Sequence, residues 1–251
     1  MKAINAKHFL LQASIDHDLL PNNTDYPYSL PIVKQFRTLE FHPNVTFLIG
    51  ENGSGKSTLL ESLAIGMGFN AEGGSRNFRF STKDSHSDLH RYIRLVKGLR
   101  RPRDGYFLRA ESFYNLASEI ENLDEDPSAG PTITPSYGGI SLHQQSHGES
   151  FISLMEHRFR GNGLYILDEP EAALSPARQF KLLQLLKKHT NNGAQFIIAT
   201  HSPILMGYPD SVIIVVTAEG LRQVSYEETE HYKLTKYFLD NRDDVLKELL
   251  G

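Results

Sequence analysis

The chain has 251 residues, 39% of them hydrophobic and 22% charged, with a formal net charge of −4. This length suits one globular domain, or a domain with an inserted lobe. The net negative charge excludes a surface that attracts nucleic acid everywhere, so such binding would need a local basic patch. Because the chain has no cysteine, disulfides and cysteine-ligated zinc are excluded, which agrees with a cytoplasmic location.

The apolar runs are all short. Residues 9–11 are too few for the core of a signal peptide, and the run at residues 212–216 is far shorter than a membrane span. We therefore expect no membrane insertion by the chain itself.

The first third of the chain predicts a strand followed by a helix. Residues 21–27 form a loop by composition, and residues 32–41 fit a strand, or a short helix and then a strand. The apolar residues 45–49 predict a strand, a glycine-rich loop follows, and residues 59–65 begin a helix.

The middle third is less regular. Glycines interrupt residues 66–74, and alternation at residues 77–81 predicts a strand. A strand over 106–110, a helix over 112–123 and a loop over 127–139 follow. Between the predicted strands 77–81 and 106–110 lies a basic run that fits either the exposed face of a helix or a nucleic-acid contact: Arg91, Arg94, Lys97, Arg100, Arg101 and Arg103.

The last third predicts a helix after Gly148, buried strands over 164–167 and 195–199, and a helix that starts at Ser175-Pro176. Two further strands, 212–216 and 221–224, and a mostly helical tail complete the chain. This alternation predicts an α/β fold with a mostly parallel sheet. We expect a single domain over residues 1–251, with a largely helical lobe inserted at about residues 70–146.

The loop after the 45–49 strand has the pattern of a phosphate-binding loop. Its glycines let successive backbone N–H groups face phosphate oxygens, and the helix that follows adds the positive end of its dipole. Lys56 is expected to reach the β- and γ-phosphates of a nucleotide, and the Ser57 hydroxyl to face Mg²⁺. A plain glycine turn would not require this lysine and these hydroxyls. The predicted nucleotide-binding residues are Asn52, Gly53, Ser54, Gly55, Lys56, Ser57 and Thr58.

Two carboxylates, Asp168 and Glu169, follow the predicted buried strand at residues 164–167. Ligands of parallel sheets bind at the carboxyl ends of the strands. Asp168 is expected to hold Mg²⁺ through water, and Glu169 to polarise the attacking water. A helix-capping acid pair is the alternative, and the phosphate loop disfavours it.

His201 follows the predicted strand 195–199, where its ring could contact a γ-phosphate or the attacking water. Upstream, Ser146, Gly148 and Glu149 open a helix whose N-terminus could bind an anion. Taken alone, this second segment fits an ordinary capped helix.

In this order and spacing, the four motifs resemble those of the ATP-binding-cassette (ABC) ATPases. Gly50–Thr58 looks like their Walker A, 164–169 like their Walker B, 146–149 like their signature, and His201 like their switch histidine. The resemblance implies ATP and Mg²⁺ as cofactors and ATP hydrolysis as the reaction. It also implies an ATP-dependent homodimer in which Ser146 and Gly148 act on the nucleotide of the other subunit.

The sequences Asp-Glu-Pro-Glu at 168–171 and Thr-His-Ser-Pro at 200–203 are similar to the soluble SMC, RecF and OLD-like ABC ATPases. The chain also resembles small stand-alone bacterial ATPases described only as "AAA family". The signature lacks its usual first leucine and has His147 for glycine. Glu111 stands where the family has a metal-contacting glutamine, which makes it a third candidate metal ligand beside Ser57 and Asp168.

Three roles follow for a hydrolase whose dimer closes on ATP. The first is a DNA-related or defence process, with the basic run as the candidate DNA contact. The second is the energy-coupling subunit of a membrane transporter, which needs a membrane partner. The third is nucleotide-gated control of a partner toxin or nuclease. For the adenine ring, Tyr26, Tyr28 and Phe36 are candidate stacking residues.

Overall fold

The computed structural model describes residues 8–21, 25–71, 73–75, 87–109, 118, 121, 124, 132, 134–139, 144–217 and 219–251. Within them, the chain folds around a six-stranded sheet with the strand order β5-β6-β7-β3-β8-β9. The first five of these strands run parallel, and β9 is antiparallel to β8 at one edge. The bounds are β3 Val45–Gly50, β5 Asp104–Arg109, β6 Gly163–Asp168, β7 Gln195–Ala199, β8 Ser211–Thr217 and β9 Gly220–Val224.

A smaller antiparallel sheet, β2-β1-β4, packs beside the main sheet. Its strands are β1 Leu10–Ile15, β2 Thr38–Glu40 and β4 Ile93–Lys97. The fully buried Gln195 of β7 joins the two sheets. Its amide oxygen accepts from the N–H groups of Phe9 and Leu10, and its amide nitrogen donates to the carbonyls of Leu10 and His42. One polar side chain thereby ties the small sheet to the strand that leads to His201.

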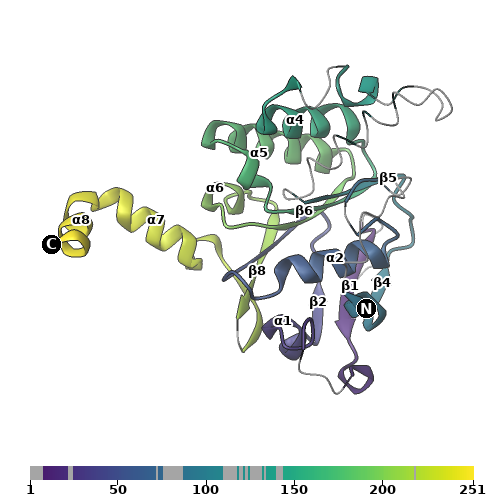
Figure 1. The fold of residues 1–251 in the computed structure, drawn as a ribbon, viewed down its shortest axis with the longest axis horizontal. Coiled ribbons are helices and arrows are strands. Elements are labelled where there is room, and N and C mark those ends of the chain that lie inside the picture. The colour runs from purple at the N-terminus through teal and green to yellow at the C-terminus, as the bar shows by residue number, and fades with distance from the viewer. Residues whose placement is uncertain are drawn as a thin grey trace.

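The main sheet is covered on both faces because alternate residues of its strands point to opposite sides. On one face, Phe47 and Tyr165 join the core formed with α4 and α5; on the other, Leu48 and Ile166 join the core formed with α1, α2 and the small sheet. Figure 1 shows this layering, with α4, α5 and α6 on one side of the sheet and α1 and α2 on the other. The helices are α1 Pro31–Gln35, α2 Lys56–Gly66, α4 His147–Ser153, α5 Pro176–Asn191 and α6 Pro203–Met206, and a π-helical turn over Leu154–Arg158 extends α4.

The chain ends in α7 Glu230–Asp240 and α8 Arg242–Leu250, which project away from the body (Figure 1). Leu234, Tyr237, Leu249 and Leu250 of this arm are exposed. None of the described helices is long and apolar enough to cross a bilayer. Short 3-10 turns lie at His17–Leu19, Asp88–Arg91, Thr134–Tyr137, Pro170–Ala173 and Tyr226–Glu228.

Most predicted elements are confirmed. The α/β class, the parallel strands, the α2 and α5 helices, the short helix and strand of residues 31–40 and the helical tail all form. The helix-face interpretation of the basic run is wrong over residues 93–97, which form the edge strand β4. The predicted strand 77–81 and nearly all of the predicted helix 112–123 lie outside the described residues. Inside the range assigned to the inserted lobe, β4 and β5 pair with the two sheets, and the rest of that division stays a prediction.

Candidate functional site

The register of the strands brings the candidate residues to one edge of the main sheet, the edge formed by the carboxyl ends of its parallel strands. Arg109 of β5 lies beside Asp168 of β6, and Asp168 lies beside Ala199 of β7, two residues before His201. Ala199 in turn pairs with Leu48 of β3, so the loop after β3 begins at the same edge. The carboxyl ends of four parallel strands therefore converge, which is where ligands of such sheets bind.

The loop between β3 and α2 has the backbone that the glycine pattern predicts. Gly50, Gly53 and Gly55 have φ values of 149°, 78° and 97°, in a region that only glycine adopts freely. A Cβ at Gly55 would come within 2.4 Å of Ile32 Cγ2, and one at Gly50 within 2.6 Å of the Val216 carbonyl oxygen. The loop therefore depends on glycine for both its conformation and its packing.

Lys56 is buried at the start of α2, and its ammonium lies within the loop. Its Nζ donates to the carbonyls of Gly50 at 2.8 Å and Glu51 at 2.9 Å. Burial lowers the pKa of Lys56, and Glu169, Asp168 and Glu171 partly oppose that shift. A phosphate oxygen entering the loop would offer this cation a stronger partner than the two carbonyls.

Ser57 and Asp168 meet across the edge of the sheet. Ser57 Oγ donates to Asp168 Oδ1 at 3.1 Å, so the two proposed metal ligands already touch. Arg109 Nε lies 3.9 Å from Asp168 Oδ2, and Arg109 Nη1 donates to Glu61 at 3.0 Å. The buried carboxylate of Asp168 thus faces a cation supplied by the neighbouring strand.

This pair of oxygen ligands fits Mg²⁺. The described residues contain no group of three or more histidine, aspartate or glutamate side chains that could hold a metal. Mg²⁺ is commonly held by one or two protein oxygens together with water and substrate phosphates, which is what Ser57 and Asp168 can supply. Glu111, the third candidate ligand, lies outside the described residues.

Glu169 has an unusual backbone for a non-glycine residue, with φ 50° and ψ 53°. This left-handed conformation disfavours side chains with a Cβ and costs about 1 kcal/mol or more. It turns the chain sharply after β6 and leaves Glu169 Oε1 3.6 Å from Nε2 of His201. The predicted base and the predicted switch histidine are therefore neighbours.

His201 is surrounded by other ionisable groups. Its Nδ1 lies 3.2 Å from Nε2 of His231 on α7, and its backbone N–H donates to the carboxylate of Glu171. Burial, followed by Lys56, lowers the pKa of His201, while Glu169 opposes the shift. The ring of His201 is thus biased toward its neutral form at pH 7. Burial raises the pKa of Glu171, because it disfavours the charged carboxylate.

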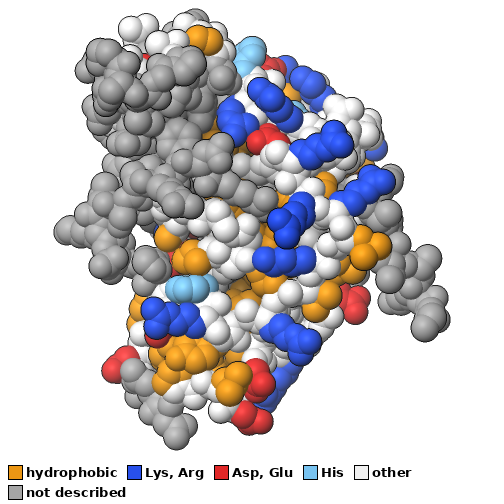
Figure 2. Space-filling view, turned by 90° about the vertical axis from the view of Figure 1, so that its right-hand side faces the viewer, with side chains coloured by type: hydrophobic (Ala, Val, Ile, Leu, Met, Phe, Trp, Pro, Cys, Tyr) orange, Lys and Arg blue, Asp and Glu red, His pale blue; other side chains and the backbone are white. Residues whose placement is uncertain are grey.

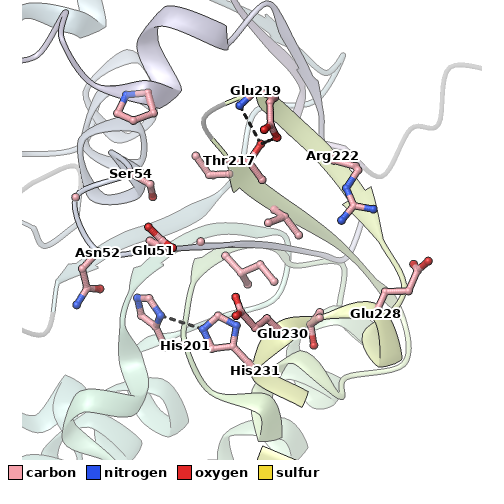
Figure 3. A pocket seen from close by; sticks show the side chains of 17 residues that line it. Glu51, Asn52, Ser54, His201, Thr217, Glu219, Arg222, Glu228, Glu230 and His231 are labelled. Carbon is pink, nitrogen blue, oxygen red and sulfur yellow. Dashed lines mark hydrogen bonds between the residues drawn. The ribbon is translucent and has the colours of Figure 1, made fainter. Parts of the chain in front are cut away.

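A cavity of about 760 Å³ opens beside the phosphate loop. Its wall runs from the loop to the end of β8, β9 and the start of α7, and Figure 3 shows His201 and His231 side by side within it. Lys56 and Ser57 are not among its lining residues, so the cavity borders the phosphate site and does not coincide with it. The side chains that line it include Glu51, Asn52, Ser54, His201, Thr217, Glu219, Arg222, Glu228, Glu230 and His231.

The predicted signature turn is occupied by its own side chains. Ser146 caps α4, and both its backbone N–H and its hydroxyl donate to Glu149 Oε2, at 2.9 and 2.6 Å. Arg178 of α5 pairs with Glu149 at 2.9 Å and donates to Ser146 Oγ at 3.2 Å. Hydrogen bonds from Ser146 lower the pKa of Glu149, and Arg178 adds to the shift. None of these contacts reaches the phosphate loop.

The adenine candidates separate by exposure. Phe36 is fully buried, and Tyr28 is buried with its hydroxyl bonded to Asp88. Tyr26 is 61% exposed, and its hydroxyl lies 3.3 Å from Thr58 Oγ1 beside the loop. Only Tyr26 of the three presents a ring face that a base could cover.

Several residues that reach the site were not singled out from the sequence: Arg109, Glu61, His231 and Gln179. Gln179 on α5 accepts from Ser202 Oγ and donates to the Leu174 carbonyl, which joins the loop after β6 to the loop of His201. Arg109 could have been found from its place at the end of a predicted strand. His231 gives no such signal, because it lies in a helix far along the chain.

Comparison with known proteins places these features in one family. A protein-family model described as "AAA domain, putative AbiEii toxin, Type IV TA system" matches residues 135–207, and a second, described as "AAA domain", matches residues 30–132. The cytochrome c biogenesis ATP-binding export protein CcmA of Mesorhizobium japonicum is 31% identical over 166 residues, which are 62% of this chain and 77% of that protein.

Other relatives agree. The energy-coupling factor transporter ATP-binding protein EcfA1 of Fusobacterium nucleatum is 29% identical over 165 residues, 62% of each protein. The chain spans 15% to 62% of the length of the first curated relatives that it matches. Among solved structures, cbiO1 of Clostridium perfringens, part of an ABC transporter complex, aligns with a TM-score of 0.50 and 16% identity over 96% of this chain and 100% of that one.

Proposed function

The chain belongs to the ABC-type ATPases, and we propose that it is an enzyme that hydrolyses ATP at a composite site completed by a second copy. The observation that carries the proposal is the convergence of Lys56, Ser57, Asp168, Glu169 and His201 on the phosphate loop of one chain. Each group has a task in phosphoryl transfer to water, a reaction that depends on positioning and on charge neutralisation.

The loop and its cation bind the triphosphate. Backbone N–H groups of residues 52–58 surround the phosphates, and Lys56 exchanges its two carbonyl partners for the β- and γ-phosphate oxygens. Ser57 and Asp168 hold Mg²⁺, which neutralises charge on the phosphates when it is bound. Tyr26 is the residue proposed to stack on the adenine ring.

Glu169 and His201 act on the side of the γ-phosphate. The Glu169 carboxylate accepts a proton from the attacking water, and His201 donates a hydrogen bond from Nε2. Their 3.6 Å separation lets both reach one water and one phosphate oxygen. Because burial lowers the pKa of His201, its ring is neutral and acts as a hydrogen-bond donor without forming an ion pair with Glu169.

The second copy supplies Ser146 and Gly148. Both lie at the N-terminus of α4, a seven-residue helix, and Gly148 packs so tightly that a Cβ would come within 2.7 Å of the Ala173 carbonyl. The hydrogen bonds of Ser146 to Glu149 and Arg178 do not involve the phosphate loop of its own chain, which supports a role for the turn at the nucleotide of another subunit. Closing the dimer then places the γ-phosphate between two chains.

Glu169→Gln tests the assignment of the base. The amide cannot accept the proton, so the rate of phosphate release at saturating ATP should fall by roughly 10² to 10⁴, while ATP binding persists. Glu156→Gln, which alters an ion pair with Lys181 on the far helix, is the matched control and should keep the parental rate. A Glu169→Gln protein that hydrolyses ATP at the parental rate contradicts the assignment.

For the process that the cycle serves, we propose contact with DNA through the strand β4 and the loop that follows. Arg91, Arg94, Lys97, Arg100, Arg101 and Arg103 are all exposed there, and residues 89–103 contain no acidic side chain. Figure 2, which views the side on which β4 lies, shows several Lys and Arg side chains spread over the described part of this face. Phosphate contacts of this kind depend strongly on salt.

The DNA proposal is tested by titrating labelled duplex DNA at 50 and 200 mM salt. Binding at low salt that weakens steeply with salt is expected, and the variant with both Arg100→Glu and Arg101→Glu should lose it. Lys187→Glu on α5, another exposed basic residue, is the control. Absence of binding at 50 mM salt contradicts the proposal.

A second candidate is the ATP-binding subunit of a transporter, which the printed names of the export and energy-coupling relatives favour. Co-purification with a membrane protein from detergent-solubilised cells would support it. A third, nucleotide-gated control of a toxin or nuclease, is favoured by the description of the family model over residues 135–207. Toxicity of a neighbouring gene that this chain suppresses only with intact Lys56 would support that role.

A further inference from the structure

The cavity beside the phosphate loop contains a pair of histidines from elements far apart in the chain. His201 follows β7, and His231 is the second residue of α7. Nδ1 of His201 and Nε2 of His231 are 3.2 Å apart, which is a hydrogen bond (Figure 3). This bond joins the first turn of the projecting C-terminal arm to the residue that faces Glu169.

The two remaining ring nitrogens have no hydrogen-bond partner among the described residues. These are Nε2 of His201 and Nδ1 of His231, and both are buried. Nε2 of His201 lies 3.6 Å from the carboxylate of Glu169, within its electrostatic reach but beyond a hydrogen bond. On the His201 ring, Nδ1 is therefore bonded to His231, and Nε2 faces Glu169.

A hydrogen bond between two neutral imidazoles determines which nitrogen of each ring carries the proton. A neutral ring donates from one nitrogen and accepts at the other. If His201 donated from Nδ1, the lone pair on its Nε2 would face the Glu169 carboxylate, which is repulsive. If His231 donates from Nε2, then His201 accepts at Nδ1 and has its proton on Nε2, where the carboxylate attracts it. Electrostatics thus favours the second arrangement.

We propose that His231 is a positioning residue: its Nε2–H donates to Nδ1 of His201 and so holds His201 in the tautomer that donates from Nε2 toward Glu169 and the γ-phosphate. The partner of one imidazole nitrogen decides which nitrogen bears the proton, and this control of the tautomer is what the role requires. The catalytic consequence rests on the proposed function, whereas the tautomer itself does not.

Burial, helped by Lys56, lowers the pKa of both rings and so favours the neutral forms that the bond requires. His231 faces Glu230, Lys56 and Glu171 as well as His201, and burial is the main cause that lowers its pKa. The N-terminus of α7 places the positive end of the helix dipole at His231, which also disfavours a charged ring. Two neutral rings, one donor and one acceptor, satisfy the contact.

The tautomer can be observed directly. Two-bond ¹H–¹⁵N spectra of protein labelled with ¹⁵N-histidine distinguish Nε2–H from Nδ1–H rings, and the His201 and His231 signals are assigned by their loss in His201→Gln and His231→Leu. At pH 7.5 we expect the His201 signal to report Nε2–H in the parent protein, and to shift toward a mixture of tautomers in His231→Leu. An Nδ1–H signal for His201 in the parent overturns the proposal, whether or not the protein hydrolyses ATP.

The effect on hydrolysis is measured with a graded pair. His231→Leu removes the donor, and the ATPase kcat should fall by about tenfold with KM for ATP unchanged within about threefold. His231→Gln restores an N–H donor and should recover most of the rate. Lys236→Ala, which breaks an exposed ion pair further along α7, is the control for the helix and should keep the parental kcat.

A double-mutant cycle separates positioning from a merely structural role. If His231 acts through His201, then His231→Leu should have no further effect on kcat in a His201→Gln background. Equal losses from His231→Leu in both backgrounds overturn the proposal, and so does a His231→Gln protein as slow as His231→Leu.

Discussion

The phosphate loop and the signature turn are both built around a helix N-terminus, yet they differ in where their polar groups point. At the loop, Lys56, Ser57 and Asp168 are buried or half-buried: Lys56 donates to the loop carbonyls, and Ser57 donates to Asp168. At the turn, Ser146 and Glu149 are exposed and bonded to each other and to Arg178. The phosphate site is thus assembled within the chain, whereas the signature turn, its proposed second half, faces outward.

The difference separates two kinds of requirement. Nucleotide binding needs only groups that one chain already holds together, so it should survive changes at the signature turn. Hydrolysis by the proposed mechanism needs the turn of a second chain. Variants at the phosphate loop should therefore lose nucleotide binding, whereas variants at the signature turn should lose hydrolysis and keep binding.

The largest effect is expected at Lys56. Lys56→Ala removes the cation that meets the γ-phosphate, so ATP binding weakens and the hydrolysis rate falls by roughly 10² to 10³. Calorimetric titration with a non-hydrolysable ATP analogue and a phosphate-release assay measure the two quantities. Lys187→Ala, exposed on α5, is the control. A Lys56→Ala rate within threefold of the parent would contradict the role of the loop.

The next effect is expected at Gly148. A side chain there meets the Ala173 carbonyl and Arg178 Nη1, each at 2.7 Å, so Gly148→Val displaces the signature turn. We expect the hydrolysis rate to fall by at least about tenfold because the second wall of the site is lost. The affinity of the chain for the ATP analogue should stay within about twofold of the parent. Loss of nucleotide binding in Gly148→Val would show that the two regions are not separable.

Lowering the pH should weaken the region around His201 and His231 before it weakens the signature turn. The pKa of both His201 and His231 is lowered below 6.5, mainly by burial, so the unfolded chain binds more protons than the folded one as pH falls. Their contribution to stability is present above pH 6.5 and is lost as pH falls through their folded pKa values. The pKa of Glu149 is lowered below 4.5, so the bonds of the signature turn should persist at pH 5.5.

The measurement is the urea midpoint of unfolding at pH 7.5, 6.5 and 5.5. We expect the midpoint to fall between pH 6.5 and 5.5, and to fall less in a protein with both His201→Gln and His231→Gln. The charged groups that face the pair, Lys56, Glu169, Glu171 and Glu230, remain in both proteins. An equal drop in the two proteins would place the acid sensitivity elsewhere.

The smallest effect is expected at Arg178. Its contacts with Glu149 and Ser146 are exposed, and exposed ion pairs contribute little to stability. Arg178→Ala should lower Tm by less than about 4 °C while leaving binding of the ATP analogue unchanged. A Tm drop well above this would mean that Arg178 is structural, and the turn would then be less free to meet a second chain.

The sequence predicts those parts of the molecule whose pattern lies in contiguous residues. The β3 strand, the glycine loop and α2 are contiguous, so apolar pattern, glycines and lysine together predict both the fold and the phosphate site there. The Asp168-Glu169 pair is equally local. Strand β1 was missed because its pairing partner β4 lies about eighty residues later in the chain.

The remaining site features depend on tertiary contacts. The left-handed backbone of Glu169 and the four hydrogen bonds of Gln195 exist only when distant segments meet. His231 reaches His201 because α7 starts at the cavity, a placement that the helical pattern of the tail does not contain. Arg109 approaches Asp168 through the register of two strands separated by more than fifty residues.

The most direct test of the composite site is the mass of Glu169→Gln in solution, measured by light scattering with and without ATP and Mg²⁺. We expect a monomer without nucleotide and a dimer of twice the 28.3 kDa chain mass with ATP, because hydrolysis no longer opens the closed state. The same protein carrying Gly148→Val should bind ATP and stay monomeric. A Glu169→Gln protein that binds ATP and remains at the monomer mass would contradict the central claim.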